Sequence, residues 1–288
     1  MKALIAGREH RLLPTRHLDA LDEFMHGHRK KTLFFIERLG ALAGRLGLDP
    51  DQVRVLELGC GNGRVVTLPV AEQGFQVTGI DSHQPSIDAA RARAGRIDVD
   101  FRCADFRDAP RDGSFHCVIL SDVLEHVDDP GAMLDVATAA LRPDGIVLVS
   151  VPNGYGPYEI EQFLVRKKIL LPALALVRGL VAVGVRIKHA LRGRPPAQPD
   201  APAYNFDSPH VQHFTLRSLR RLLGSRGLEL AARRNGAFVG GDLTYFAFYF
   251  WPGLVRLSLT SVDSLPSVLA GSWLLECRRV GADAGTST

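Results

Sequence analysis

The sequence predicts an α/β fold in which helices cover both faces of a parallel sheet. From residue 53 to residue 151, short apolar runs alternate regularly with helix-like segments, which is the pattern of such a sheet. The first run leads directly into a turn with three alternating glycines, and acidic residues follow three successive runs. With 288 residues and 46% hydrophobic content, the chain is long enough to bury one large domain of this kind.

Composition narrows the class of protein. The formal charge of +4 arises from 35 basic against 31 acidic residues, an excess too small and too dispersed to indicate nucleic acid as a partner. The four cysteines, at positions 60, 103, 117 and 277, include no CxxC pair, and three lie in or beside expected buried strands. We therefore expect reduced thiols in a cytoplasmic protein. The first residues lack a signal-peptide pattern, so secretion is not expected.

The N-terminal part is expected to be helical. Apolar side chains recur at spacings of three and four over residues 17 to 47, and Gly27 is expected to divide this region into two helices. Residues 1 to 13 show no pattern that predicts a role.

The first predicted strand, residues 53 to 58, ends in the turn Gly59-Cys60-Gly61-Asn62-Gly63. Glycines here permit turn dihedrals that a Cβ resists, and they let a ligand approach the main chain at the start of the following helix. Pro69 is expected to kink that helix. Glu57 places a carboxylate at the strand end, where it suits a cationic ligand better than a pyrophosphate. The turn therefore predicts a site for a positively charged, nucleotide-like ligand.

Two more carboxylates follow the next two strands. Residues 76 to 80 form the second predicted strand and end in Asp81, at the distance along the chain where an acid accepts hydrogen bonds from ribose hydroxyls. Asp105 follows the third apolar run, residues 97 to 101. Three acids at successive strand ends predict a cleft for an adenosine that carries positive charge. The alternative for each acid is a helix N-cap or turn carboxylate.

In this order, the motifs resemble those of the class I S-adenosylmethionine-dependent methyltransferases. Residues 115 to 127 resemble their fourth strand and loop, and residues 141 to 153, with a turn at Pro143-Asp144-Gly145, resemble their fifth strand. The likeness covers about residues 50 to 155 and, more loosely, 210 to 230 and 272 to 279. It implies a doubly wound, Rossmann-like, seven-stranded sheet, mostly parallel with an antiparallel last strand. The last two strands are expected at residues 228 to 233 and 272 to 279, after a helix capped by Thr215.

The resemblance also implies S-adenosylmethionine as cofactor and a role for each site residue. The glycine turn would line the methionine part, whose ammonium Glu57 would support, while Asp81 would take the ribose. Asp105 would receive the adenine amino group, with Phe106 packed on the ring. The implied cofactor-binding set is Glu57, Gly59, Cys60, Gly61, Asn62, Gly63, Asp81, Ser82, Asp105, Phe106 and Ser121. In many members an N-terminal helix closes over the cofactor, so the cluster His28-Arg29-Lys30-Lys31 is either part of such a lid or a solvated helix face.

The Leu-Glu-His-Val loop, residues 124 to 127, and the segment from residue 210 to 215 most resemble the small-molecule branch that includes quinone-biosynthesis O-methyltransferases. His126 is our candidate general base, and the alternative is a histidine that only braces the loop. His210 is a second catalytic candidate, and with His213 it could contact the acceptor. These two histidines could also form a metal site, but no carboxylate-rich pattern accompanies them, so no metal is predicted.

The region from residue 155 to 209 interrupts the alternation and is predicted to be a helical cap insertion. Residues 169 to 185 are almost wholly apolar, but Pro172 and Arg178 interrupt them and basic residues flank them. A spanning helix needs about 20 apolar residues, so we expect a cap, alone or with peripheral membrane contact through residues 166 to 192. An aromatic stretch, residues 245 to 251, could form a second wall. The expected organisation is N-terminal helices with a lid (1–48), a methyltransferase domain (49–154 and 210–280) and the cap (155–209).

We therefore expect a methyltransferase that acts on an oxygen, before nitrogen or carbon, of a hydrophobic or lipid-linked small molecule. It is expected in the cytoplasm, either with or without peripheral contact to the membrane. The alternative is a non-catalytic S-adenosylmethionine-binding or scaffold protein with the same fold. A dehydrogenase is disfavoured by Glu57 and by the loop at residues 124 to 127.

Overall fold

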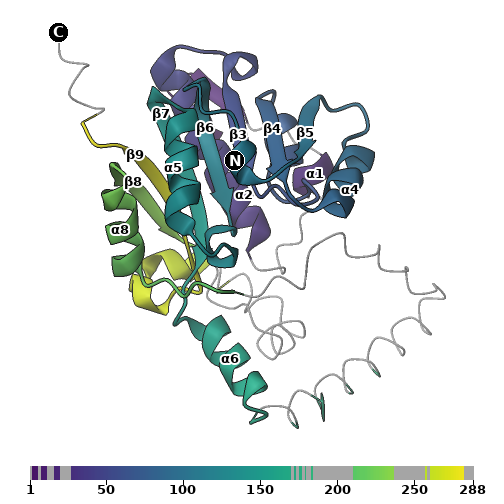
Figure 1. Cartoon of the computed structure of the whole chain (residues 1–288), viewed down its shortest axis with the longest axis vertical. Helices are drawn as coiled ribbons and strands as arrows, with labels where there is room; N and C mark the ends of the chain where they lie inside the picture. The colour runs from purple at the N-terminus through teal and green to yellow at the C-terminus, as the bar shows by residue number, and fades with distance from the viewer. Residues whose placement is uncertain are drawn as a thin grey trace.

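The computed structural model describes residues 2–5, 8–11, 16–19, 27–169, 210–236 and 260–281, together with positions 172, 175, 176, 179, 183 and 257. Within these residues, seven strands form one sheet in the order β5-β4-β3-β6-β7-β9-β8 (Figure 1). The strands are β3 (Arg54–Leu58), β4 (Gln76–Asp81), β5 (Val99–Cys103), β6 (Phe115–Ser121), β7 (Leu141–Pro152), β8 (Leu228–Asn235) and β9 (Ser272–Arg279).

Strands β3 to β7 pair in parallel, whereas β9 is antiparallel to both of its neighbours, β7 and β8. The predicted seven-stranded sheet, mostly parallel with an antiparallel last strand, is confirmed. Because the carboxyl ends of parallel strands meet at one edge of a sheet, the residues that follow β3, β4, β5 and β6 gather there.

Helices cover both faces of the sheet, because successive side chains of a strand point to opposite faces. On one face, Leu56 and Val118 pack with α5 (Pro130–Ala140) and α8 (Leu216–Ser225). On the other, Val55 and Ile119 pack with α2 (His28–Leu46). A third, smaller core joins α3 (Thr67–Ala71) and α4 (Gln84–Ala94) to β5. Figure 1 shows α5 in front of the sheet and α2 behind it.

Two boundaries differ from the sequence prediction. The turn expected at residues 143 to 145 lies inside β7, which begins at Leu141. The register between β6 and β7 shifts there, from Phe115 opposite Leu141 to Cys117 opposite Ile146, so the extra residues form an irregularity in the ladder. The helix expected directly after the glycine turn begins only at Thr67 and is short, so that Pro69 lies in its first turn, where a missing N–H removes no hydrogen bond within the helix.

The N-terminal region contains more structure than its sequence pattern indicates. Strands β1 (Lys2–Ile5) and β2 (Arg8–Arg11) form an antiparallel hairpin. In α1 (Arg16–Asp19), the backbone N–H and ring of His17 bond to the carboxylate of Glu72. Gly27 stands immediately before α2, as expected, and residues 20 to 26 lie outside the described residues.

Short 3-10 helices connect the larger elements: η1 (Pro50–Gln52), η2 (Phe106–Asp108), η3 (Leu124–His126), η4 (Val262–Ser264) and η5 (Ser267–Leu269). The four cysteines are free thiols, of which Cys60, Cys117 and Cys277 are buried and Cys103 is exposed. Burial raises the pKa of Cys117 well above its ordinary value, so this core thiol stays protonated and unreactive.

The predicted insertion begins with α6 (Pro157–Arg166). Most of residues 169 to 185, and the aromatic residues 245 to 251, lie outside the described residues, so the cap and the domain boundaries stay predictions. Three of the positions described in this stretch, Ile169, Leu176 and Val183, have exposed side chains. None of the helices in the described part of the chain has the length and apolar content needed to cross a bilayer.

Candidate active site

A cavity of about 410 Å³ opens at the carboxyl ends of β3, β4, β5 and β6. Its lining includes every predicted cofactor-binding residue except Gly63, and it includes His126 but not His210. Gly63 instead lies against the ring of Phe101 in β5. The predicted set therefore meets around one space because four parallel strands deliver their following loops to the same edge of the sheet.

The glycine turn permits close contact between two of these loops. Gly59 has a φ of +75°, and a Cβ at this position would lie 2.5 Å from Cγ2 of Val123. Any side chain here would therefore strain the backbone and push away the loop that follows β6. This contact holds the turn after β3 against the loop that carries His126.

Both oxygens of the Asp81 carboxylate are held by the backbone. Oδ2 accepts the N–H of Gly61 and Oδ1 accepts the N–H of His83, each at 2.8 Å. Since a carboxylate oxygen can accept more than one hydrogen bond, Asp81 is fixed in direction and still able to accept from a ligand. Asp105 accepts the N–H of Arg107 at 2.8 Å and caps η2. This carboxylate therefore does have the capping role that was the alternative for each of the three acids. It also lines the cavity beside Phe106.

Glu57 is buried, with 3% of its surface exposed, although it lines the cavity. Burial raises its pKa to about 8, against the opposing effects of a hydrogen bond from the Thr67 hydroxyl and of the Lys31 charge. Near neutral pH this carboxyl group is therefore largely protonated. A cation placed beside it would favour its ionised form.

Lys31 is a site residue that the sequence did not single out from its basic cluster. It lies in the first turn of α2, is 7% exposed and lines the cavity. Its ammonium hydrogen-bonds the carboxylate of Asp122, which also accepts the Ser150 hydroxyl at 2.6 Å. Burial alone would raise the pKa of Asp122. The Lys31 charge and these hydrogen bonds have a larger, opposite effect and lower the pKa to about 2. The sequence signal that could have identified Lys31 is the helical period, which places this residue on the apolar face of α2.

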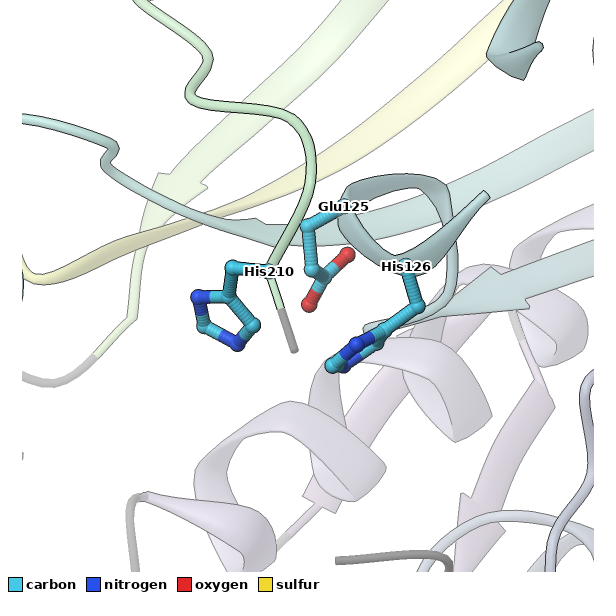
Figure 2. Close-up of side chains that lie close together, drawn as sticks. All are labelled: Glu125, His126 and His210. Atoms are coloured by element: carbon cyan, nitrogen blue, oxygen red, sulfur yellow. The ribbon is translucent and has the colours of Figure 1, made fainter. Parts of the chain in front are cut away.

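A cluster of two histidines and a carboxyl group lies beside the cavity. The rings of His126, in η3, and His210 are 4.8 Å apart between centroids and meet edge to face. Figure 2 shows both rings converging on the side chain of Glu125. The backbone N–H groups of Val211 and Gln212 donate to the carbonyl of Glu125 at 2.8 and 3.0 Å, so the segment that carries His210 is fastened to η3.

Two acidic residues of this cluster were missed by the sequence analysis. Glu125 is 1% exposed, and burial, with the nearby Asp122 charge, raises its pKa well above the ordinary value. Its Oε2 has no hydrogen-bond partner among the described residues. Glu159 of α6 is 6% exposed, and its Oε1 is 2.6 Å from Nδ1 of His210. The Leu-Glu-His-Val motif was the one sequence signal that could have identified Glu125, and no sequence signal indicated Glu159.

One potential ligand atom from each of Glu125, His126 and His210 lies within 4.8 Å of the others. This spacing admits an ion, but burial raises the pKa of the Glu125 carboxyl group, which disfavours the ionised form that binds metals. The absence of a metal stays a prediction.

Comparison with known proteins places the chain in a family. A family model described as a methyltransferase domain matches residues 25–232. The ubiquinone biosynthesis O-methyltransferase of Bradyrhizobium sp. (strain ORS 278) is 36% identical over 103 residues, which are 35% of this chain and 40% of that protein. The enzyme of the same name from Chromobacterium violaceum is 32% identical over 133 residues, 45% of this chain and 53% of that protein. The match thus spans about half, or less, of the length of these curated relatives.

Among solved structures, an S-adenosylmethionine dependent methyltransferase from Mesorhizobium loti aligns with a TM-score of 0.50 at 18% identity, over 91% of this chain and all of that one. This likeness supports the fold alone. Because the family model matches more than half of the sequence, the chain belongs to the methyltransferase-domain family, and the resemblance seen in its motifs is confirmed.

Proposed function

We propose that this chain transfers a methyl group from S-adenosylmethionine to an oxygen of a hydrophobic or lipid-linked small molecule. One observation carries the proposal: a single cavity brings together the buried carboxyl group of Glu57, the backbone-held carboxylate of Asp81 and the imidazole of His126. The names of the curated relatives, O-methyltransferases of ubiquinone biosynthesis, support an oxygen as the acceptor atom.

The residues of the cavity fit the parts of this donor. Asp81 would accept the ribose hydroxyls with the lone pairs that its backbone contacts leave available. Burial raises the pKa of Glu57 to about 8 in spite of the Lys31 charge, and the donor's ammonium beside it would favour the ionised carboxylate. Lys31 would place a positive charge near the donor's carboxylate.

When bound, the donor supplies a methyl group on a positively charged sulfur. The task of the chain is then to hold the acceptor oxygen in line with the breaking bond and to exclude water. His126 lies in the cavity wall, where it would accept the hydroxyl proton as the new bond to oxygen forms. His210 lies next to His126, one layer farther from the cavity, and would assist it.

Membrane contact is supported by the first helix of the insertion. On α6, Glu159 and Glu161 are buried, whereas Ile160 and Phe163 are 55% and 51% exposed. Lys167 follows, with its ammonium over the ring of Phe163. Apolar side chains beside a cation suit the edge of an anionic bilayer, where each basic residue contributes about 1 kcal/mol. We propose that the segment from 166 to 192 makes this contact, and that the chain works in the cytoplasm.

The proposal is tested by methyl transfer from labelled donor to two kinds of acceptor: a lipid extract, and an alkylated catechol in detergent micelles. We expect label in an apolar product and none without an acceptor. Donor binding by calorimetry without any labelled product would instead support the non-catalytic alternative. Binding to vesicles is measured separately, and we expect retention by anionic vesicles, release by added salt, and no retention by neutral vesicles.

A further inference from the structure

We propose that Glu159 of α6 is a positioning residue for methyl transfer, which holds His210 in the orientation and tautomer that assist His126. This inference rests on the proposed function and deepens it. It assigns a role in the acid–base part of the site to a residue from the predicted cap segment, outside the region that carries the methyltransferase motifs.

The geometry of the pair is that of a carboxylate that orients an imidazole. Oε1 of Glu159 lies 2.6 Å from Nδ1 of His210, and Oε2 lies 3.6 Å from Nε2 of His213. An ionised Glu159 carboxylate would only accept hydrogen bonds, and we therefore assign the proton between Glu159 and His210 to Nδ1. The neutral His210 ring then carries its lone pair on Nε2. Because Glu159 is buried, solvent competes little for this hydrogen bond.

The second nitrogen of His210 lies on the side of the ring that faces the cluster. Figure 2 shows it turned towards His126 and Glu125. Nitrogen atoms of both rings and a carboxyl oxygen of Glu125 lie within 4.8 Å of one another. A lone pair fixed on Nε2 therefore faces the ring that lines the cavity. In the opposite tautomer a proton would take its place.

The reaction explains why this orientation matters. The bond between sulfur and the methyl carbon breaks with its electron pair left on sulfur, while the acceptor oxygen forms a bond to that carbon. The oxygen loses its proton to His126, so positive charge passes from sulfur to an imidazolium ring. The His210 lone pair and, behind it, the negative charge of Glu159 stabilise that imidazolium ring. Glu159 thus acts through His210 and touches neither donor nor acceptor.

The pair also connects the acceptor side of the molecule to the catalytic loop. Glu159 belongs to α6, the first helix of the predicted cap, whereas His210 belongs to the segment fastened to η3 by hydrogen bonds to Glu125. The chain offers a matched control on the same helix. Glu161 is as buried as Glu159, at 6% exposure, and it is not among the residues that line the cavity or form the histidine cluster in the described part of the chain.

The first test needs no acceptor and no catalytic turnover. Nitrogen NMR of protein labelled in histidine reports the tautomer of His210, assigned by loss of its signals in His210→Gln. We expect the Nδ1–H tautomer in the native chain and a mixture in Glu159→Gln. An Nε2–H tautomer in the native chain would overturn the inference, whatever the enzyme methylates.

The second test compares rates of methyl transfer to the alkylated catechol with donor affinities measured by calorimetry. We expect Glu159→Gln and His210→Gln each to lower kcat about 10-fold or more at unchanged donor Kd, and the double variant to lose no more than either single one. Glu159→Asp should recover part of the rate, and Glu161→Gln should keep the native rate. The inference would be overturned if the two losses of kcat multiplied in the double variant, or if Glu161→Gln lost as much kcat as Glu159→Gln. A native chain that binds donor but methylates no acceptor would overturn the proposed function instead.

Discussion

Burial controls the charge of individual residues at this site. Glu57 and Glu125 both lie in loops or strands that deliver them to the interior, and burial raises the pKa of each. Asp122 is as close to the cavity but has Lys31 as a partner, and its pKa is lowered to about 2. The pKa values of Asp122 and Glu125, three residues apart along the chain, are thus shifted in opposite directions, as is common for carboxyl groups at sites of proton-transfer chemistry.

Replacing Glu57 by Gln should raise the stability of the empty protein at alkaline pH. The folded-state pKa of about 8 lies above the ordinary value of 4.5, so the unfolded chain ionises this group first. The native protein therefore loses stability as the pH rises from about 4.5 to about 8, by about 1.4 kcal/mol for each unit of difference in pKa. In thermal unfolding, Glu57→Gln should have a higher Tm than the native chain at pH 8 and an equal Tm at pH 4. The same Tm difference at both pH values would contradict this assignment of charge.

Replacing His126 by Gln should lower turnover about 100-fold, because proton removal by a positioned base contributes at least that much. Donor affinity should stay nearly unchanged, since the candidate donor contacts other than Ser121 lie in or follow β3, β4 and β5, whereas His126 follows β6. Steady-state rates and calorimetric titration with the donor measure the two quantities. A native rate in the variant would leave His126 only the role of bracing its loop.

At the scale of elements, three segments far apart in the sequence meet beside the cavity: η3, the residues around 154, and the segment from 210 to 215. Gly154 permits their close approach. Its N–H donates to the carbonyl of Phe214 at 2.9 Å, and a Cβ at this position would lie 2.6 Å from the backbone of His213. The positions of His210 and His213 therefore depend on a glycine at position 154.

Replacing Gly154 by Ala should displace the segment that carries His210. We expect a loss of about 1–3 kcal/mol of stability, the range for inserting an atom into a packed site, and lower methyl transfer at unchanged donor affinity. Gly224 in α8 is the control, because a Cβ there meets nothing within 4 Å. Gly224→Ala should leave activity unchanged and add about 0.5–1 kcal/mol of stability. Chemical denaturation measures the stability of both variants, and rate measurements give their activity. Equal stability changes in the two variants would show that residue 154 is not tightly packed.

At the scale of the whole molecule, the cavity joins the N-terminal helix α2 to the loops of the sheet, since Lys31 and Glu57 line the same space. A ligand bound there contacts both parts at once. Binding to the native state alone stabilises a protein in proportion to the logarithm of ligand concentration over Kd.

We therefore expect donor at about 100 times its Kd to stabilise the protein by about 2.7 kcal/mol, and so to raise its Tm by several degrees. Asp81→Ala should weaken donor binding by about 1.5–3 kcal/mol, the range for hydrogen bonds to a charged group, and should need correspondingly more donor for the same rise. Thermal unfolding over a series of donor concentrations measures both. A folded Asp81→Ala variant with native affinity would remove the ribose assignment.

The sequence by itself determined the sheet, the strand ends and most of the candidate cofactor site. These follow from local patterns: apolar runs set strands, glycines set the turn after β3, and the carboxyl ends of parallel strands share one edge, so Glu57, Asp81 and Asp105 had to meet. The tertiary structure alone decided the contacts between distant segments. Lys31 reaches Asp122, 91 positions away, and Glu159 reaches His210, 51 positions away. It also decided that Gly63 supports β5 outside the cavity lining and that the pKa values of Glu57 and Glu125 are raised. Burial and long-range contact depend on how separate elements pack, and no local pattern in the chain specifies them.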